Sequence, residues 1–295
     1  MNSNSHTSSQ FRINLKRNNP LQIVGCINAY SALMAEKVGH KCIYLSGAGV
    51  ANASFGMPDL GMTNLNDVLE DAKRIRGVTN LPLLVDIDTG WGGAFNISRA
   101  IKEMCRSNVS AIHIEDQVDQ KRCGHRPNKE MVSKFEMIDR IKTCVDSKEN
   151  DDFFIIARTD AFANEGIQKS IDRVSAYIEA GADAIFAEAM TDIKQYKVIK
   201  DQINVPILAN MTEFGKTPLY TLEELKDVGV DMILYPLSAF RAMNNAALAV
   251  YKNILDNGHQ KNSINEMQTR DELYEFLDYH SYEEKLDNLF KKNRN

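Results

Sequence analysis

The chain has 295 residues, 43% of them hydrophobic and 25% charged, and its formal net charge is −5 with both signs interspersed. This balance is typical of a globular protein with a full core, and it argues against nucleic acid or an anionic membrane as the main partner. No apolar stretch in the sequence is long enough to cross a bilayer.

Residues 1–10 are polar and lack the apolar segment of a secretory signal, so we expect a disordered tail there and a single domain over residues 11–295. The five cysteines are odd in number and lack metal-ligand spacing. We therefore expect reduced thiols and a cytoplasmic protein.

Short apolar runs recur along the chain, each followed by polar or glycine-bearing residues and then by a helical pattern. Near-continuous apolar runs are what a parallel sheet buried on both faces requires. The predicted strands are residues 21–27, 41–45, 81–88, 111–116, 153–157, 184–187, 205–209 and 232–235. The predicted helices are residues 65–76, 96–107, 133–147, 166–179 and 222–227, with Asn64 or Asn66 and Ser133 as N-caps and Gly181 and Gly229 as terminators.

Eight β-α units in a row predict a (β/α)8 TIM-type barrel, and a doubly wound open sheet is the alternative with the same local pattern. No GxGxxG turn follows any predicted strand, which disfavours dinucleotide binding. After Asn257 the sequence predicts extra helices over 264–277 and 282–290. Because their apolar residues need a partner surface, we expect a homo-oligomer; these residues are Leu273, Phe276, Leu277, Leu286 and Phe290.

The segment Lys121-Arg122-Cys123-Gly124-His125 places a thiol between two cations and a histidine, just after the strand predicted over 111–116. Neighbouring positive charge favours the thiolate, so we expect Cys123 to exchange a proton near neutral pH. The alternative is an ordinary loop cysteine among solvated charges. Acidic residues at other strand ends favour the reactive interpretation.

Asp86 and Asp88 follow one predicted strand, and Glu115 ends the next one. Two residues apart on a regular strand, Asp86 and Asp88 point the same way, and two such carboxylates repel each other unless a cation lies between them. With Glu115, they predict an oxygen-rich site for Mg²⁺, and Mn²⁺ would fit the same ligands. The alternative is that the aspartates cap the helix near Asn96, which the intervening glycines Gly90, Gly92 and Gly93 disfavour.

Three arginines are candidate clamps for a carboxylate-bearing substrate. Arg158 follows the apolar run 153–157 and so starts at the barrel rim, where a guanidinium can bind a carboxylate in two-point fashion. Pairing with Asp160 or Glu188 is its structural alternative. Arg241 and Arg270 are further candidates, each with a solvated surface arginine as the alternative. Arginines gathered around a carboxylate-metal site in an acidic protein favour a small polyanion as the substrate.

Seven segments together resemble the isocitrate lyase and phosphoenolpyruvate mutase superfamily over nearly the whole chain. They are residues 44–47, 84–90, 113–117, 121–128, 157–161, 210–215 and 234–241. The Lys-Arg-Cys-Gly-His segment is what separates the lyases of this superfamily from its mutases and decarboxylases. The likeness is closest to the lyases that cleave 2-methylisocitrate.

The resemblance implies Mg²⁺-dependent cleavage of (2S,3R)-2-methylisocitrate, a tricarboxylate, into pyruvate and succinate, a step of the methylcitrate cycle in propionate catabolism. It assigns the metal to Asp86, Asp88 and Glu115, and the general acid to Cys123. The general base stays open between Tyr44 and a metal-bound hydroxide. The resemblance also implies a homotetramer that exchanges its C-terminal helices, so that Arg270 reaches an active site.

The remaining implied residues bind the two halves of the substrate. The pyruvate half would contact the backbone amides of Ser46, Gly47 and Ala48 and the guanidinium of Arg158. The succinate half would contact Gly124, the catalytic His125, Glu188, Asn210, Met211 and Thr212. Isocitrate lyase activity is one alternative, and oxaloacetate decarboxylase or phosphonate chemistry on the same barrel is another. A barrel that only binds is a third, and the retained thiol and carboxylates disfavour it.

Overall fold

The structure is a computed structural model that describes residues 7–291. The chain divides into two compact units, one up to Phe240 and the other from Arg241 onward. The second unit corresponds to the helical tail that the sequence predicts as part of one domain.

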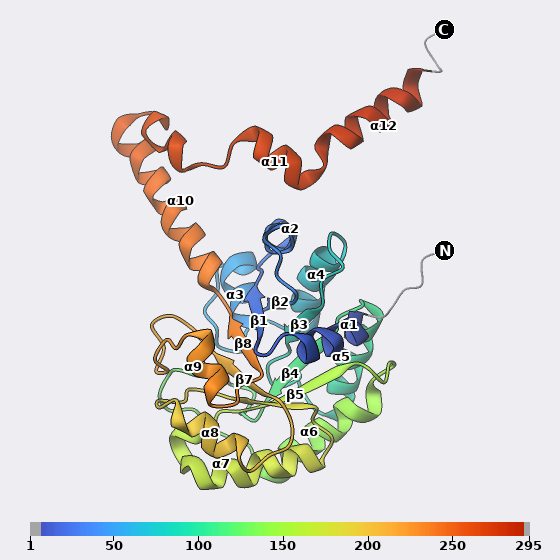
Figure 1. The fold of residues 1–295 in the computed structure, drawn as a ribbon, viewed down its shortest axis with the longest axis vertical. Coiled ribbons are helices and arrows are strands. Elements are labelled where there is room, and N and C mark those ends of the chain that lie inside the picture. The colour runs from blue at the N-terminus through green and yellow to red at the C-terminus, as the bar shows by residue number, and fades with distance from the viewer. Residues whose placement is uncertain (1–6, 292–295) are drawn as a thin grey trace. The chain divides into compact units, whose positions relative to one another are not determined.

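Residues 7–240 form a closed barrel of eight parallel strands in the order β1 to β8, with β8 also paired to β1 (Figure 1). The strands are β1 (Leu21–Gly25), β2 (Ile43–Leu45), β3 (Leu83–Asp86), β4 (Ala111–Glu115), β5 (Phe154–Thr159), β6 (Ala184–Ala187), β7 (Ile207–Asn210) and β8 (Met232–Tyr235). The predicted (β/α)8 barrel is confirmed, and closure excludes the doubly wound alternative. In a closed parallel barrel the carboxyl ends of all strands meet at one rim.

Helices follow the strands around the barrel. They are α2 (Ala29–Val38), α3 (Gly47–Phe55), α4 (Leu65–Arg76), α5 (Ala94–Arg106), α6 (Lys134–Ser147), α7 (Phe162–Glu179), α8 (Lys194–Lys200) and α9 (Leu222–Asp227). The side chains of Asn64 and Ser133 cap α4 and α6 as predicted. Helices α2, α3 and α8 were not predicted, because they are short and their apolar pattern does not stand out from that of the neighbouring strands.

Helix α1 (Thr7–Arg17) precedes the barrel and corrects the predicted tail, whose residues 7–10 are helical. Thr7 Oγ1 donates to the carbonyl of Asn108 at 2.9 Å, and Phe11 is fully buried against Phe154 with ring centroids 5.0 Å apart. These contacts order a polar segment that has no apolar pattern of its own. Residues 1–6 of the predicted tail lie outside the described residues.

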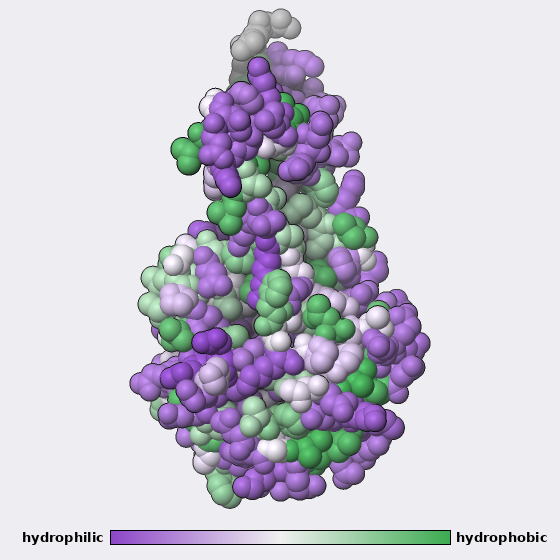
Figure 2. All heavy atoms as spheres, turned by 90° about the vertical axis from the view of Figure 1, so that its left-hand side faces the viewer, coloured by the Kyte–Doolittle hydropathy of each residue, from purple (hydrophilic) through white to green (hydrophobic). Residues whose placement is uncertain are grey.

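The core of the barrel unit consists of two layers. One lies inside the barrel and includes Tyr44, Leu84 and Phe186, whereas the other packs the strands against the helices and includes Val85 and Ile112. Because alternate residues of each strand face the two layers, both must be apolar, which explains the near-continuous apolar runs. On the face that Figure 2 presents, hydrophilic and hydrophobic residues of the surface are interspersed.

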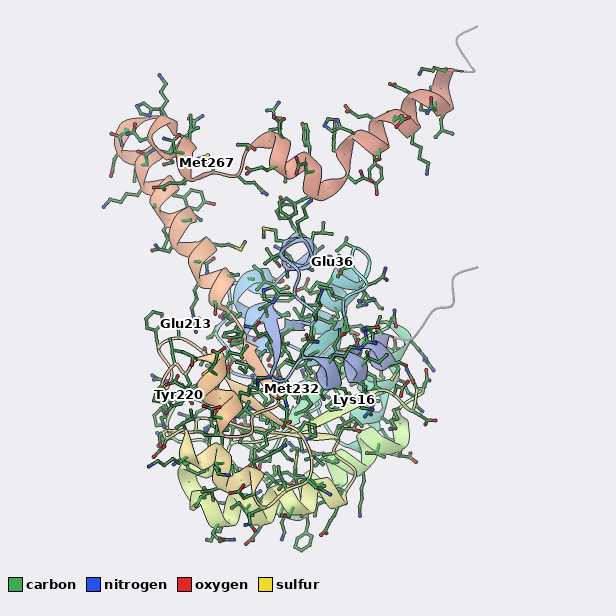
Figure 3. All side chains as sticks on the ribbon, in the orientation of Figure 1. Lys16, Glu36, Glu213, Tyr220, Met232 and Met267 are labelled. Carbon is green, nitrogen blue, oxygen red and sulfur yellow. The ribbon has the colours of Figure 1, made fainter. Side chains whose placement is uncertain are left out.

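The second unit is helical: it contains α10 (Ser238–Asn257) from Arg241 onward, a 3₁₀ turn over Lys261–Glu266, α11 (Arg270–Leu277) and α12 (Tyr279–Lys291). The helix predicted over 264–277 is two elements, because the 3₁₀ turn ends before Met267 (Figure 3) and Thr269 then caps α11 with a capping box. None of the described residues of α10, α11 and α12 is buried. Within residues 7–291 no helix is both long and apolar enough to cross a membrane.

Candidate active site

Asp86 and Asp88 converge at the carboxyl end of β3. A Cβ atom placed on Gly47 would lie 3.1 Å from a carboxylate oxygen of each, so both carboxylates face one spot. The strand ends at Asp86, and Asp88 has a left-handed backbone with φ 49°, so the regular-strand argument for their common direction was wrong. The carboxylates meet because the chain turns after β3. Both are buried, which excludes solvated helix caps.

A lysine from the thiol segment lies at this carboxylate pair. Lys121 Nζ is 2.6 Å from Asp88 Oδ1 and 2.5 Å from Asp59 Oδ1, and its side chain is 5% exposed. Burial opposes the charge on Lys121, but Asp88, Glu115 and Asp59 raise its pKa well above the usual range. Lys121 is therefore protonated and balances the buried aspartates. A cavity of about 300 Å³ borders Asp88 and Lys121.

Arg158 and Glu115 face each other at the ends of two neighbouring strands, β5 and β4. Arg158 Nε lies 3.3 Å from Glu115 Oε2 and 2.9 Å from Asp160 Oδ2, and the guanidinium lies over the Phe186 ring at 5.0 Å. The structural alternative of pairing with Asp160 therefore holds. Pairing does not remove Arg158 from the site, since a guanidinium has five N–H donors and these contacts engage only part of them.

The predicted three-carboxylate metal site stays a prediction. Among residues 7–291, no group of three or more His, Cys, Asp and Glu side chains is arranged to hold a metal ion. Asp88 faces Lys121 and Glu115 faces Arg158, because a buried carboxylate takes the nearest cation. Glu115 Oε1 is nevertheless buried, and no described residue donates a hydrogen bond to it or pairs with it. A buried carboxylate oxygen without a partner is a ligand that fits a hard divalent cation.

Burial also governs the charge state of these carboxylates. Burial raises the pKa of Asp88 to about 6, against the lowering effect of Lys121. Burial also raises the pKa of Glu115 well above its usual range, although the charges of Arg158 and Lys121 oppose the shift. Without further positive charge, the site therefore disfavours ionisation of all its carboxylates at once.

Tyr44 lies inside the barrel, where its hydroxyl is 2.9 Å from His113 Nε2 and 3.4 Å from Asp86 Oδ2. Burial and the charge of Asp86 raise the pKa of Tyr44 well above its usual value. Burial also lowers the pKa of His113 to about 4, so the imidazole is neutral at pH 7. A tyrosine that resists ionisation is a poor general base, so the geometry disfavours that predicted role.

Cys123 is partly buried, and its electrostatics differ from the prediction. Burial raises the pKa of the thiol, although the backbone N–H of His125 and the charge of Arg158 oppose the shift. The expectation of a favoured thiolate was wrong because Lys121 turns to Asp59 and Asp88 rather than to the thiol. A thiol that keeps its proton at neutral pH suits a general acid.

Gly124 and His125 pack against Glu188 at the end of β6. A Cβ atom on Gly124 would lie 2.5 Å from both Arg158 Nη2 and Glu188 Cγ, so only glycine fits there. His125 Nε2 lies 2.7 Å from Glu188 Oε1, while its Nδ1 accepts the backbone N–H of Lys216 at 2.9 Å. Asn210 Nδ2 donates to Glu188 at 3.3 Å. The predicted succinate-binding residues Gly124, His125, Glu188 and Asn210 are thus brought together.

Of the other predicted substrate-binding residues, Ser46, Gly47 and Ala48 lie at the start of α3 and Thr212 follows β7. Ser46 accepts the N–H of Gly49 as the N-cap of α3, and the N–H of Gly47 donates to Asp86 Oδ2 at 3.0 Å, with Ala48 next in the first turn. Thr212 is buried just after β7, at the start of the loop that holds Glu213 and leads to Tyr220 (Figure 3).

Met211, Arg241 and Arg270 are the last of the predicted substrate-binding residues. The side chain of Met211 packs in the layer between strands and helices, so it does not reach the site as predicted. Its neighbour Asn210 faces the other way because alternate residues of a strand do. Arg241 and Arg270 belong to the second unit, so their roles as clamps stay predictions.

Two residues of the site, Asp59 and Lys129, carried no signal in the sequence, and His113 was noted only as part of the segment 113–117. Asp59 pairs with Lys121, and His113 contacts Tyr44 and lies 5.2 Å from the Phe186 ring. Lys129 is buried and bonds both Asp160 and the carbonyl of Gly124. Each comes from a different element, and only the folded barrel shows that they converge.

Known proteins that are similar to this chain identify its family. The phosphoenolpyruvate phosphomutase family profile matches residues 11–255. The chain is 60% identical to a 2-methylisocitrate lyase of Shewanella oneidensis over 97% of this chain and 98% of that protein. It is 58% identical to a 2-methylisocitrate lyase of Vibrio cholerae over 96% of this chain and 94% of that protein. A solved 2,3-dimethylmalate lyase superposes with a TM-score of 0.88 at 30% identity, covering 96% of this chain and 95% of that one.

The chain therefore belongs to the phosphoenolpyruvate phosphomutase family, within the isocitrate lyase superfamily. In that family it groups with the 2-methylisocitrate lyases, to which it is similar over nearly its whole length. The resemblance stated from the sequence motifs is confirmed.

Proposed function

We propose that the protein is a carbon–carbon lyase that cleaves (2S,3R)-2-methylisocitrate into pyruvate and succinate. The observation that carries this proposal is the placement of the Cys123 thiol on a segment that packs on Arg158 and Glu188 and pairs with Asp88 through Lys121. One site thus unites a proton donor, carboxylates for a cation, and a guanidinium for an anionic substrate. The names of the relatives support the same substrate.

Mg²⁺, or Mn²⁺ in its place, is the proposed cofactor, held by Asp86, Asp88 and Glu115. The fit rests on Glu115 Oε1, which is buried and has no hydrogen-bond partner among residues 7–291, and on the carboxylates of Asp86 and Asp88, which face one spot. When bound, the cation would supply Lewis-acid polarisation of the hydroxyl and carboxylate of the pyruvate half, which eases transfer of the hydroxyl proton to hydroxide, the base candidate that remains beside the disfavoured Tyr44. It also supplies the positive charge that lets Asp88 and Glu115 ionise together.

The protein residues bind and orient the two halves of the substrate. The guanidinium of Arg158 and the first turn of α3 would hold the pyruvate half. His125, Asn210 and Thr212 would hold the succinate half, where donors stabilise the charge that develops as the C–C bond breaks. The bonding electrons leave on the succinate half as an aci-carboxylate, and Cys123 gives that carbon its proton. The raised pKa of Cys123 keeps that proton available at neutral pH.

Two features of the whole molecule belong to the proposal. We expect a homotetramer that exchanges C-terminal helices, because α12 exposes large apolar side chains, among them Leu286 and Phe290, each 54% exposed. We also place the protein in the cytoplasm and in propionate catabolism through the methylcitrate cycle. The free thiols support a cytoplasmic location, since all five cysteines, which lie in the described part of the chain, form no disulfide.

The decisive assay uses purified protein with 2-methylisocitrate or isocitrate, each with Mg²⁺, Mn²⁺ or EDTA. Pyruvate release that EDTA abolishes and either cation restores is the expected result. Faster glyoxylate release from isocitrate would reassign the protein as an isocitrate lyase, since one methyl group in a pocket is worth only about 1–3 kcal/mol. Cleavage of neither substrate would overturn the proposal and leave the decarboxylase and phosphonate alternatives to test.

A further inference from the structure

Cys123 is held between two anchored neighbours in a closed loop, here called the thiol loop and defined as residues 117–131. A β-bridge between Gln117 and Met131 closes the loop at its base. On one side of the thiol, the Gln117 side chain bonds both the N–H and the carbonyl of Arg122, at 3.0 and 2.9 Å. On the other side, Lys129 Nζ donates to the carbonyl of Gly124 at 2.6 Å.

Lys129 also ties the thiol loop to the end of β5. Its Nζ lies 2.7 Å from Asp160 Oδ1, and the same carboxylate accepts two hydrogen bonds from Arg158. The Lys129 side chain is only 2% exposed. Burying an ammonium group is costly unless it is fully paired, so a surface role for this lysine is excluded.

The backbone around Lys129 is fixed as well. Asn128 has a left-handed backbone with φ 59°, which turns the chain just before Lys129. Asn164 Nδ2, from α7, donates to the Lys129 carbonyl at 2.7 Å. Lys129 therefore joins the two ends of the segment 124–129 and holds both ends on the barrel.

We propose that Lys129 is a positioning residue that sets the place of the Cys123 thiol by holding the Gly124 carbonyl against Asp160. This inference rests on the proposed function only where it concerns catalysis. Without Lys129, the segment from Cys123 to His125 loses its charged anchor and lifts from Arg158 and Glu188, against which Gly124 packs. The thiol becomes more accessible, and it no longer faces the carbon that it would protonate.

The test measures the alkylation of Cys123 by iodoacetamide in substrate-free protein, with peptide masses to identify the labelled thiol. Cys105, a partly buried free cysteine on α5, is the internal reference. In Lys129→Met we expect Cys123 to react at least about tenfold faster relative to Cys105, the scale of one lost charge-assisted hydrogen bond. Loss of positive charge alone would favour the less reactive thiol form, so a faster reaction reports exposure.

Three further variants separate positioning from general damage. Lys129→Arg keeps the charge and should restore much of the protection. Lys197→Met is the matched control, because its Nζ pairs with Asp201 on the surface, and it should leave the Cys123 rate unchanged. If Lys129→Met does not fold, Asn164→Ala frees the Lys129 backbone and should raise the rate in the same direction. A Cys123 rate at the wild-type level in Lys129→Met, or in Asn164→Ala if the first does not fold, would overturn the inference.

The catalytic consequence is measured separately with 2-methylisocitrate. In Lys129→Met we expect kcat to fall by at least about tenfold while KM changes less, since the lost contact positions a proton donor rather than a binding group. A rise in KM of about tenfold with an unchanged kcat would contradict the positioning role. Because the alkylation assay needs no substrate, it decides on the loop even if the proposed function fails.

Discussion

Lys121 Nζ lies 2.6 Å from Asp88 Oδ1, so the thiol loop and the candidate metal carboxylates form one ionic unit. The same ammonium contacts Asp59, which lies between α3 and α4. Three parts of the chain therefore depend on one buried lysine for their charge balance.

Removal of this lysine should make the fold depend on a divalent cation. Lys121→Met leaves Asp86 and Asp88 buried without their cation, and breaking a buried pair costs about 3–5 kcal/mol. We expect a lower Tm than wild type in EDTA, with a larger recovery on addition of Mg²⁺. Lys197→Met, which breaks the exposed pair with Asp201, is the control and should change Tm little. Equal Mg²⁺ shifts in Lys121→Met and wild type would refute the charge-balance argument.

The pH dependence of turnover should report the protonated thiol. Burial raises the pKa of Cys123 above its ordinary value of 9.0, and the acid form is the active one. Activity should therefore persist through neutral pH and decline only as pH rises past 9 and the thiol ionises. The kcat of wild type across pH 6–10 checks this. An alkaline decline below pH 8 that is absent in Cys123→Ser would contradict it.

Gly124 should tolerate no side chain. Gly124→Ala would place a Cβ 2.5 Å from Arg158 Nη2 and Glu188 Cγ, so the thiol loop must shift. We expect kcat/KM to fall by at least about tenfold with an unchanged circular dichroism spectrum, because small displacements at a reacting centre are costly. Gly93→Ala is the matched control, since its Cβ would meet nothing within 4 Å. Activity at the control level in Gly124→Ala would show that the loop is not packed as described.

The C-terminal helices should hold the oligomer together. Leu286 and Phe290 on α12 are each 54% exposed, and burying such side chains is worth about 1.5–3 kcal/mol apiece. Sedimentation velocity should show a tetramer for the wild type and smaller species for the double change Leu286→Ser and Phe290→Ser. A wild-type monomer would refute the exchanged-helix proposal.

The barrel could be predicted because its signal is local. Each strand is an apolar run, and the repeat of eight such units does not depend on which residues touch. The helix over 65–76 and its Asn64 cap were predictable for the same reason. Helix α1 was missed, because distant partners such as Asn108 and Phe154 hold it in place rather than a pattern of its own.

The site was predictable in its residues but not in its pairings. Asp86, Arg158 and Glu188 follow from their places at strand ends, where a barrel gathers them. The pKa of Cys123 could not follow from its neighbours in sequence, because Lys121 turns away from the thiol and burial decides the shift. Lys129 gave no signal at all, since its partners Gly124 and Asp160 come together only in the folded chain.

The most direct test of the account compares pyruvate release from 2-methylisocitrate by the wild type and by Cys123→Ser, both with saturating Mg²⁺. A serine hydroxyl is a far weaker acid at the same place, so kcat should fall by about 10²–10⁴-fold while the variant keeps the Tm of the wild type. Wild-type turnover by a folded Cys123→Ser would contradict the central claim that this partly buried thiol completes the cleavage by giving its proton.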